Sequence, residues 1–165
     1  MSLYTVVPLF VLVSLIQSTV TSSVHILGAS PDLVLMMAVA CVLQWGVRES
    51  LIAVLVGGLT IDALSGAPFG CATLSIAIVS VLAGIAESNV PRSVKTLPYA
   101  AVAVATIVYQ LIWMLLLQIW GRTVLWVPMF VRGTLPSVFV NTLAMPLMCL
   151  FVRALDRRVP DEPTV

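Results

Sequence analysis

Two aspartates within largely apolar sequence are the residues of this chain best suited to chemistry. Asp32 follows Ser30 and Pro31, and Asp62 lies further along, in the segment GGLTIDALSG. Two carboxylates can serve as general acid and base, but such a reaction also needs a positioned nucleophile or partner. The chain has a single histidine, His25, and the sequence shows no Ser–His or Cys–His arrangement. We therefore expect no catalytic residues, no bound metal and no cofactor.

The composition places these aspartates in a membrane protein. Of 165 residues, 61% are hydrophobic and 9% are charged, and the mean hydropathy is +1.14. Soluble domains carry about 25% charged and about 45–50% apolar residues. Four stretches contain no charged residue, and each is at least as long as the roughly 18–20 residues that cross a hydrocarbon core: 1–31, 63–86, 96–121 and 133–152. We predict an all-α, polytopic helix bundle in a lipid bilayer.

Six transmembrane spans fill almost the whole chain, which we interpret as one integral membrane domain, 1–165. A single helix over 31–65 would be about 52 Å long and would place Arg48 and Glu49 at the bilayer centre, where an arginine costs at least about 2.5–3.5 kcal/mol. A turn near Gln44–Gly46 avoids this cost, and a re-entrant hairpin is the alternative. The predicted spans are 3–25, 31–46, 49–65, 69–88, 97–120 and 133–153, with a short cytoplasmic tail at 154–165.

The basic residues predict the orientation of these spans. Two arginines, Arg122 and Arg132, fall on one side, and the other six basic residues fall on the side of the termini: Arg48, Arg92, Lys95, Arg153, Arg157 and Arg158. The positive-inside rule then puts both termini in the cytoplasm. Trp120, Trp126 and Phe130 lie between the last two spans, and we expect this loop to follow the outer membrane surface. Eight basic against seven acidic residues give no concentrated basic face, so we expect no nucleic-acid partner.

The two aspartates differ in what their positions predict. Asp32 suits the start of a helix, where a carboxylate caps the chain and meets the positive end of the helix dipole. Asp62 lies thirteen residues beyond Glu49, about 20 Å along a helix, in the outer half of the membrane. An acid there is costly and usually paired, so we expect Asp62 to pair with Arg122, with Arg132 or with a cation on a partner.

Serines recur every four residues in the first span, at Ser14, Ser18 and Ser22. Small residues at this spacing allow helix backbones to approach closely, and their hydroxyls can bond across the contact. One hypothesis is a docking face for a helix of another protein. Internal packing within the bundle explains the same spacing, and the sequence leaves both open.

Three segments of the chain carry a family resemblance. They are PDLVL from Pro31, GLTIDALSGAPFG from Gly58 to Gly70, and the last span with its basic end. Together they resemble the signature of the rod shape-determining membrane protein MreD family over essentially the whole chain. The residues of interest for interaction or structure are Pro31, Asp32, Gly58, Asp62, Gly66, Pro68, Gly70 and Asn141.

The resemblance implies a non-enzymatic scaffold in the bacterial cytoplasmic membrane. Proteins of this kind bind the bitopic protein MreC, and through it the MreB filament, the RodA polymerase and a penicillin-binding transpeptidase. They support rod shape and side-wall peptidoglycan synthesis. Their fold is similar to that of substrate-binding subunits of energy-coupling-factor transporters, so a vitamin or small-molecule transporter subunit is the alternative. No alanine precedes Ala29, whereas those subunits usually carry alanines at four-residue spacing in their first helix.

Overall fold

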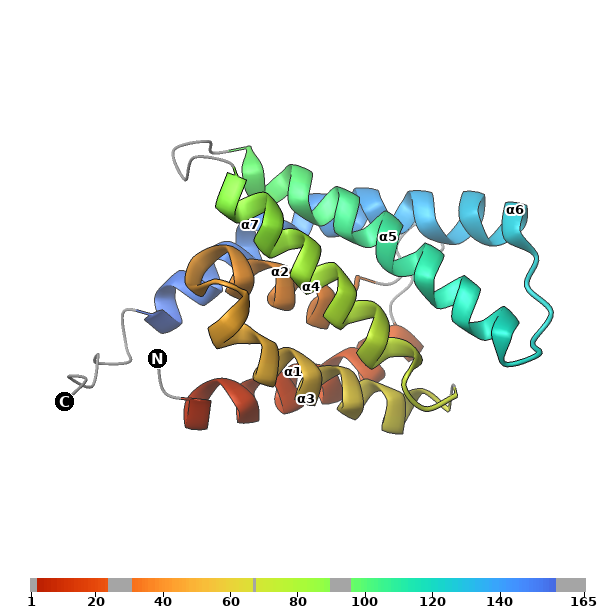
Figure 1. Ribbon diagram of the computed structural model, residues 1–165, viewed down its shortest axis with the longest axis horizontal. Helices are drawn as coiled ribbons and strands as arrows, with labels where there is room; N and C mark the ends of the chain where they lie inside the picture. The colour runs from red at the N-terminus through yellow and green to blue at the C-terminus, as the bar shows by residue number, and fades with distance from the viewer. Residues whose placement is uncertain (1–2, 24–30, 67, 90–95, 157–165) are drawn as a thin grey trace.

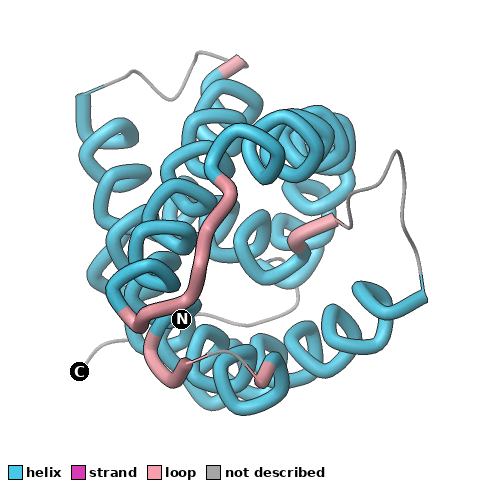
Figure 2. Tube along the Cα trace, turned by 90° about the vertical axis from the view of Figure 1, so that its right-hand side faces the viewer, coloured by secondary structure: helices cyan, strands magenta, loops and turns pink. Residues whose placement is uncertain are grey.

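Nearly all of the described chain is helical. The computed structural model describes residues 3–23, 31–66, 68–89 and 96–156, with side chains except at 3–5, 20–23 and 156 (Figure 1). Within these ranges no β-strand is present (Figure 2). The elements are α1 (Leu3–Ser23), α2 (Leu33–Trp45), α3 (Val47–Ser65), α4 (Cys71–Asn89), α5 (Leu97–Ile119), α6 (Trp126–Met129), the π-helical turn η1 (Phe130–Thr134) and α7 (Leu135–Asp156). The prediction of an all-α protein is confirmed.

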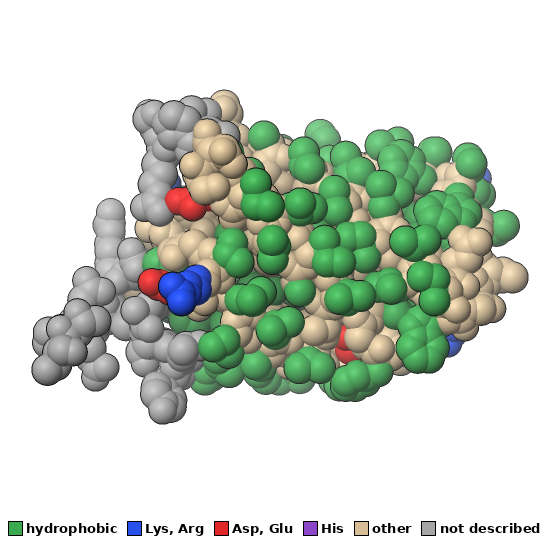
Figure 3. All heavy atoms as spheres, viewed as in Figure 1, with side chains coloured by type: hydrophobic (Ala, Val, Ile, Leu, Met, Phe, Trp, Pro, Cys, Tyr) green, Lys and Arg blue, Asp and Glu red, His purple; other side chains and the backbone are tan. Residues whose placement is uncertain are grey.

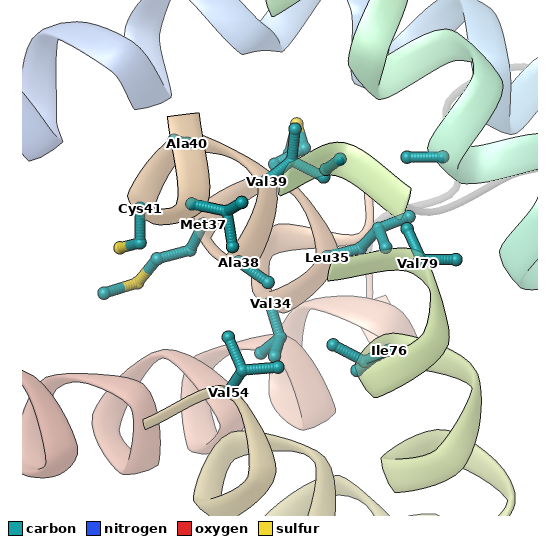
Figure 4. Close-up of a cluster of buried hydrophobic side chains, with 14 of the residues drawn as sticks. Val34, Leu35, Met37, Ala38, Val39, Ala40, Cys41, Val54, Ile76 and Val79 are labelled. Carbon is teal, nitrogen blue, oxygen red and sulfur yellow. The ribbon is translucent and has the colours of Figure 1, made fainter. Parts of the chain in front are cut away.

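Helix α2 is the centre of the bundle. It contacts α1, α3, α4, α5 and α7, and nine consecutive residues, from Val34 to Val42, are buried. Figure 4 shows side chains from α2 spread around its axis, with Val54 of α3 and Ile76 of α4 packed nearby. A helix that is apolar on every face must be surrounded by protein or lipid. Because protein surrounds it, its thirteen residues need not match the thickness of a bilayer.

The outward faces of the surrounding helices are also apolar. Leu12, Ile85, Val104 and Leu147 are among the exposed large hydrophobic residues, one each on α1, α4, α5 and α7. In Figure 3, hydrophobic side chains cover most of the visible face, and most of the charged ones lie near its two ends. A surface this apolar suits lipid contact.

Three helices in the described ranges have the length and hydropathy of membrane spans: Cys71–Asn89, Leu97–Ile119 and Trp126–Leu155. Two further apolar helices, Val6–Thr19 and Leu33–Trp45, are shorter. The expected turn between the second and third spans is present at Gly46, and α3 begins at Val47. The count of six crossings stays a prediction.

The last span differs from the prediction at both ends. Helices α6 and α7 are continuous through η1 and form one helix of 30 residues from Trp126 to Leu155, about 45 Å long. The predicted loop is therefore wrong for residues 126–132, which are helical, and the connection between α5 and α6 runs from 120 to 125. At the other end α7 runs to Asp156, so the predicted tail, 154–165, begins inside the helix. Residues 157–165 lie outside the described part.

Candidate functional site

The buried carboxylate of Asp62, on α3, accepts hydrogen bonds from the start of α4. Its side chain is 2% exposed. Oδ1 accepts a hydrogen bond from the backbone N–H of Ala72 at 2.8 Å. Oδ2 accepts from the N–H groups of Gly70 at 3.1 Å and Thr73 at 3.0 Å, and from the Thr73 hydroxyl at 2.6 Å. Asp62 thus caps a helix that follows it in the chain.

This capping accounts for the free amide groups at the start of α4. The first N–H groups of a helix have no partner within the helix, and a buried one left unpaired is costly. The N–H of Cys71 bonds to the carbonyl of Pro68 at 3.3 Å, and Leu74 N–H bonds to Gly70 at 2.9 Å. Asp62 takes the donors that remain, at Gly70, Ala72 and Thr73. The positive end of the α4 dipole also stabilises the negative charge.

Two adjacent glycines let α3 approach its neighbours closely. A Cβ atom on Gly58 would lie 2.7 Å from the Cα atom of Thr73, and one on Gly57 would lie 2.6 Å from a ring carbon of Phe10. Gly58 therefore sets the distance between α3 and α4, one turn before Asp62. The residues that the sequence grouped as a motif, Gly58, Asp62 and the Gly66–Gly70 turn, form one junction, in which Gly70 adopts a φ of +97°.

The expected ion pair of Asp62 with Arg122 or Arg132 is wrong, and a cation on a partner stays a prediction. Its partners are backbone N–H groups and one hydroxyl of α4, and in the described residues neither Arg122 nor Arg132 is paired with it. Both arginines are exposed. The charge is met by the N-terminus of a helix rather than by a cation.

A second polar cluster forms at the start of α2, around Asp32. One oxygen of Asp32, Oδ1, accepts from the N–H of Leu35 at 3.2 Å, so the predicted helix cap is present. Gln17 on α1 joins this cluster twice: its Nε2 donates to Asp32 Oδ1 at 3.0 Å, and its Oε1 accepts from Val34 N–H at 2.7 Å. A side chain of α1 therefore satisfies a free amide of α2.

Asn141 on α7 links α7 and α5 to the start of α2 through hydrogen bonds. Its side chain is fully buried. Its Oδ1 accepts from the N–H of Asp32 at 2.9 Å, and its Nδ2 donates to the Thr106 hydroxyl on α5 at 3.1 Å. Thr106 in turn donates to the carbonyl of Val102 at 2.8 Å. Helices α1, α5 and α7 thus meet at the start of α2 through hydrogen bonds.

The structure separates the serines of the first helix. Ser14 is fully buried, and its hydroxyl contacts the carbonyls of Phe10 at 2.8 Å and Gly57 at 3.1 Å, which is packing inside the bundle. Ser18 is exposed and bonds to Leu15 of its own helix at 2.9 Å. The side chain of Ser22 lies outside the described part. Ser14 and Ser18 therefore do not present one continuous outer face.

Sequence analysis missed three contributors, Gln17, Thr73 and Thr106. Each is a neutral residue on a helix, and each acts on a partner at least eleven residues away. The position of Thr73 could have indicated its role, since it follows the Gly66–Gly70 turn and lies in the first turn of the next helix. In chemical terms both clusters consist of carboxylates, amides and hydroxyls that hold helix ends together.

Comparison with known proteins identifies the family. Residues 1–159 match the family described as rod shape-determining protein MreD. No curated protein and no solved structure matched the chain. The match covers almost all of the 165 residues and agrees with the apolar helices described above. The chain belongs to the MreD family of rod shape-determining proteins, and it is an integral membrane protein.

Proposed function

We propose that this chain is a non-enzymatic membrane scaffold of the bacterial cell-elongation complex that binds an MreC-like bitopic partner. Through that partner it would act with MreB, RodA and a penicillin-binding transpeptidase to support rod shape and side-wall peptidoglycan synthesis. The observation that carries the proposal is the family match over residues 1–159. It is supported by polar clusters that consist of helix caps and interhelical hydrogen bonds.

The surface is suited to recognition by packing. Leu74, Ile78, Leu82 and Ile85 follow one another along α4 at helical spacing and are all exposed. Helices in lipid associate through close packing and a few polar bonds, because the lipid removes the hydrophobic driving force between them. A rigid bundle with apolar outer faces offers such contacts to a partner's transmembrane helix, and the Asp62 junction fixes how α4 is presented.

We also propose the cytoplasmic membrane as location, with both termini in the cytoplasm. The start of α1 and the end of α7 lie at the same end of the bundle (Figure 1). Arg48 at the start of α3 and Arg153 near the end of α7 belong to that end, whereas Arg122 and Arg132 belong to the other. A reporter fused after Val165 should be active only in the cytoplasm. Activity on the outer side would contradict this topology.

The outward end of the bundle favours a scaffold over a transporter subunit. A pocket of about 840 Å³ lies at the other end, predicted to face the cytoplasm, beside Gln44, Leu97 and Arg153. The pocket beside Asp32, at the end of the bundle predicted to face outward, has a volume of about 180 Å³. Pockets for drug-sized ligands and cofactors span about 300–1,000 Å³. A vitamin-sized substrate would therefore require the helices to separate, and Gln17, Asp32 and Asn141 hold them together there.

The test replaces the native copy in a rod-shaped host with a tagged chain and recovers it from the membrane under gentle solubilisation. The wild-type chain should bring down the MreC-like partner and maintain rod shape. Asp62→Ala should reduce both, because it loosens the start of α4. Glu49→Ala, which changes an exposed acid, is the matched control and should behave as wild type. Recovery of the wild-type chain without a partner would refute the proposal, provided that immunoblotting shows normal membrane levels.

A further inference from the structure

A small polar pocket lies beside the start of α2. Its volume is about 180 Å³, and α1, α2, α5 and α7 all contribute to its lining, which includes Asp32, Tyr109, Gln110 and Trp113. Asp32 is the one charged residue among the described residues that line it. The pocket therefore contains a carboxyl group, and none of the described residues in its wall is basic.

Within the described part of the chain, one oxygen of Asp32 has no hydrogen-bond partner. Oδ1 accepts from Leu35 N–H and from Gln17 Nε2. No described residue donates a hydrogen bond to Oδ2, and no described arginine is paired with the carboxylate. The start of α2 stabilises the ionised form, and a cation bound at Oδ2 would stabilise it further. Carboxylates in membrane proteins are usually paired, and a cation is the partner that this oxygen lacks.

Two aromatic rings and an amide also line the pocket. Tyr109 is 6% exposed, and no described residue forms a hydrogen bond with its hydroxyl, so the hydroxyl is available to a ligand in the pocket. The rings of Tyr109 and Trp113 lie 6.1 Å apart between centroids, tilted by 34°. Gln110 adds an amide that is likewise unpaired in the described part of the chain. Aromatic faces attract organic cations, and the carboxyl group of Asp32 adds a partner for the charge.

We propose that this pocket binds an organic cation, either a primary ammonium or a guanidinium group. Asp32 Oδ2 pairs with the charge, Tyr109 and Trp113 supply aromatic surface, and the carbonyl of Gln110 accepts a further hydrogen bond. The volume suits a charged group with a short stem rather than a drug-sized molecule. Two sources share this chemistry, a basic side chain presented by a protein partner and a free small amine.

The test measures thermal unfolding of the purified full chain in neutral detergent. The probes are n-butylammonium, N-acetyl-lysine methylamide and N-acetyl-arginine methylamide, with n-butanol and sodium chloride at matched concentration as controls. A ligand of the native state raises Tm as its concentration rises. We expect the cations to raise Tm in the wild-type chain and the controls to leave it unchanged.

Three variants make the test specific for the pocket. Asp32→Asn removes the charge but retains a good capping residue, and it should weaken the apparent affinity about tenfold or more, since a charge-assisted bond is lost. Trp113→Leu should weaken binding without touching the cap of α2. Glu49→Gln removes an exposed carboxylate at the opposite end of α3 from Asp62 and should respond as wild type.

Each outcome decides the proposal. A response to butylammonium and to a capped amino acid supports binding of a basic side chain of a partner. A response to butylammonium alone supports a free amine. No response to any cation, or an equal response in Asp32→Asn, would overturn the proposal.

Discussion

Removal of the Asp62 carboxylate is the sharpest test of how this bundle is held together. Asp62→Ala leaves three backbone N–H groups at the start of α4, those of Gly70, Ala72 and Thr73, without acceptors. A buried donor without a partner costs about 1–3 kcal/mol. Three such donors would together cost about 3–9 kcal/mol. Because water can reach part of the turn, we expect the free energy of unfolding to fall by an amount near the lower end of this range, about 3–5 kcal/mol. Asp62→Asn retains one acceptor oxygen and should lose about 2 kcal/mol.

The assay is thermal unfolding of the purified chain, followed by tryptophan fluorescence. At roughly 2–4 °C per kcal/mol for a chain of this size, Asp62→Ala should lower Tm by about 10 °C and Asp62→Asn by about half as much. The matched controls are Arg122→Gln and Arg132→Gln, which should leave Tm within about 2 °C of wild type, because surface substitutions usually change stability by less than about 0.5 kcal/mol. If the arginine variants reproduced the loss seen with Asp62→Ala, an ion pair would be the correct account and helix capping would be refuted.

Three further predictions concern single contacts and use the same measurement. Gly58→Ala should lower Tm by several degrees, because its new Cβ would meet the backbone of α4 at 2.7 Å, whereas Gly133→Ala, with nothing within 4 Å, should be neutral or stabilising; equal effects would disprove the close crossing. Asn141→Leu should cost about 1–3 kcal/mol, since it leaves the N–H of Asp32 without an acceptor and removes the donor to the Thr106 hydroxyl, and an unchanged Tm would show that these bonds contribute nothing. Ser14→Ala should cost about 1 kcal/mol and Ser18→Ala almost nothing; the reverse order would contradict the placement of Ser14 against α3.

The sequence predicted those features that depend on composition and local signals. Long uncharged stretches predicted the helices, and Gly46 marked the boundary between α2 and α3. The cap formed by Asp32 was also predictable, since a cap acts on residues three positions away. The fully apolar run from Val34 to Val42 could equally have faced lipid. Its burial inside the bundle depends on five other helices and has no local signature.

The extent of the last helix was missed for a similar reason. Trp126, Pro128 and two arginines between apolar stretches resemble an interfacial loop, because tryptophans favour that depth. In the structure Pro128 lies in the first turn of α6, where a missing N–H costs nothing. Trp126 Nε1 also donates to Gln118 Oε1 on α5 at 2.9 Å. This contact between the two helices could not be read from either segment alone.

The hydrogen-bond partners of Asp62 were missed because a negatively charged side chain was expected to pair with a positively charged one. An acid in apolar surroundings was expected to need an arginine, and two arginines were available on the predicted outer side. Yet α4 has Gly70 where a capping side chain would stand, and a glycine has no side-chain acceptor for the free N–H groups that follow it. A glycine before a buried helix therefore implies that an acceptor comes from elsewhere. Asp62, eight residues earlier and on the helix that Gly58 brings close, meets that requirement. The spacing of Gly58, Asp62 and the Gly66–Gly70 turn thus has one physical cause. Helix α4 begins after a glycine that has no capping side chain, and Asp62 on α3 supplies the cap.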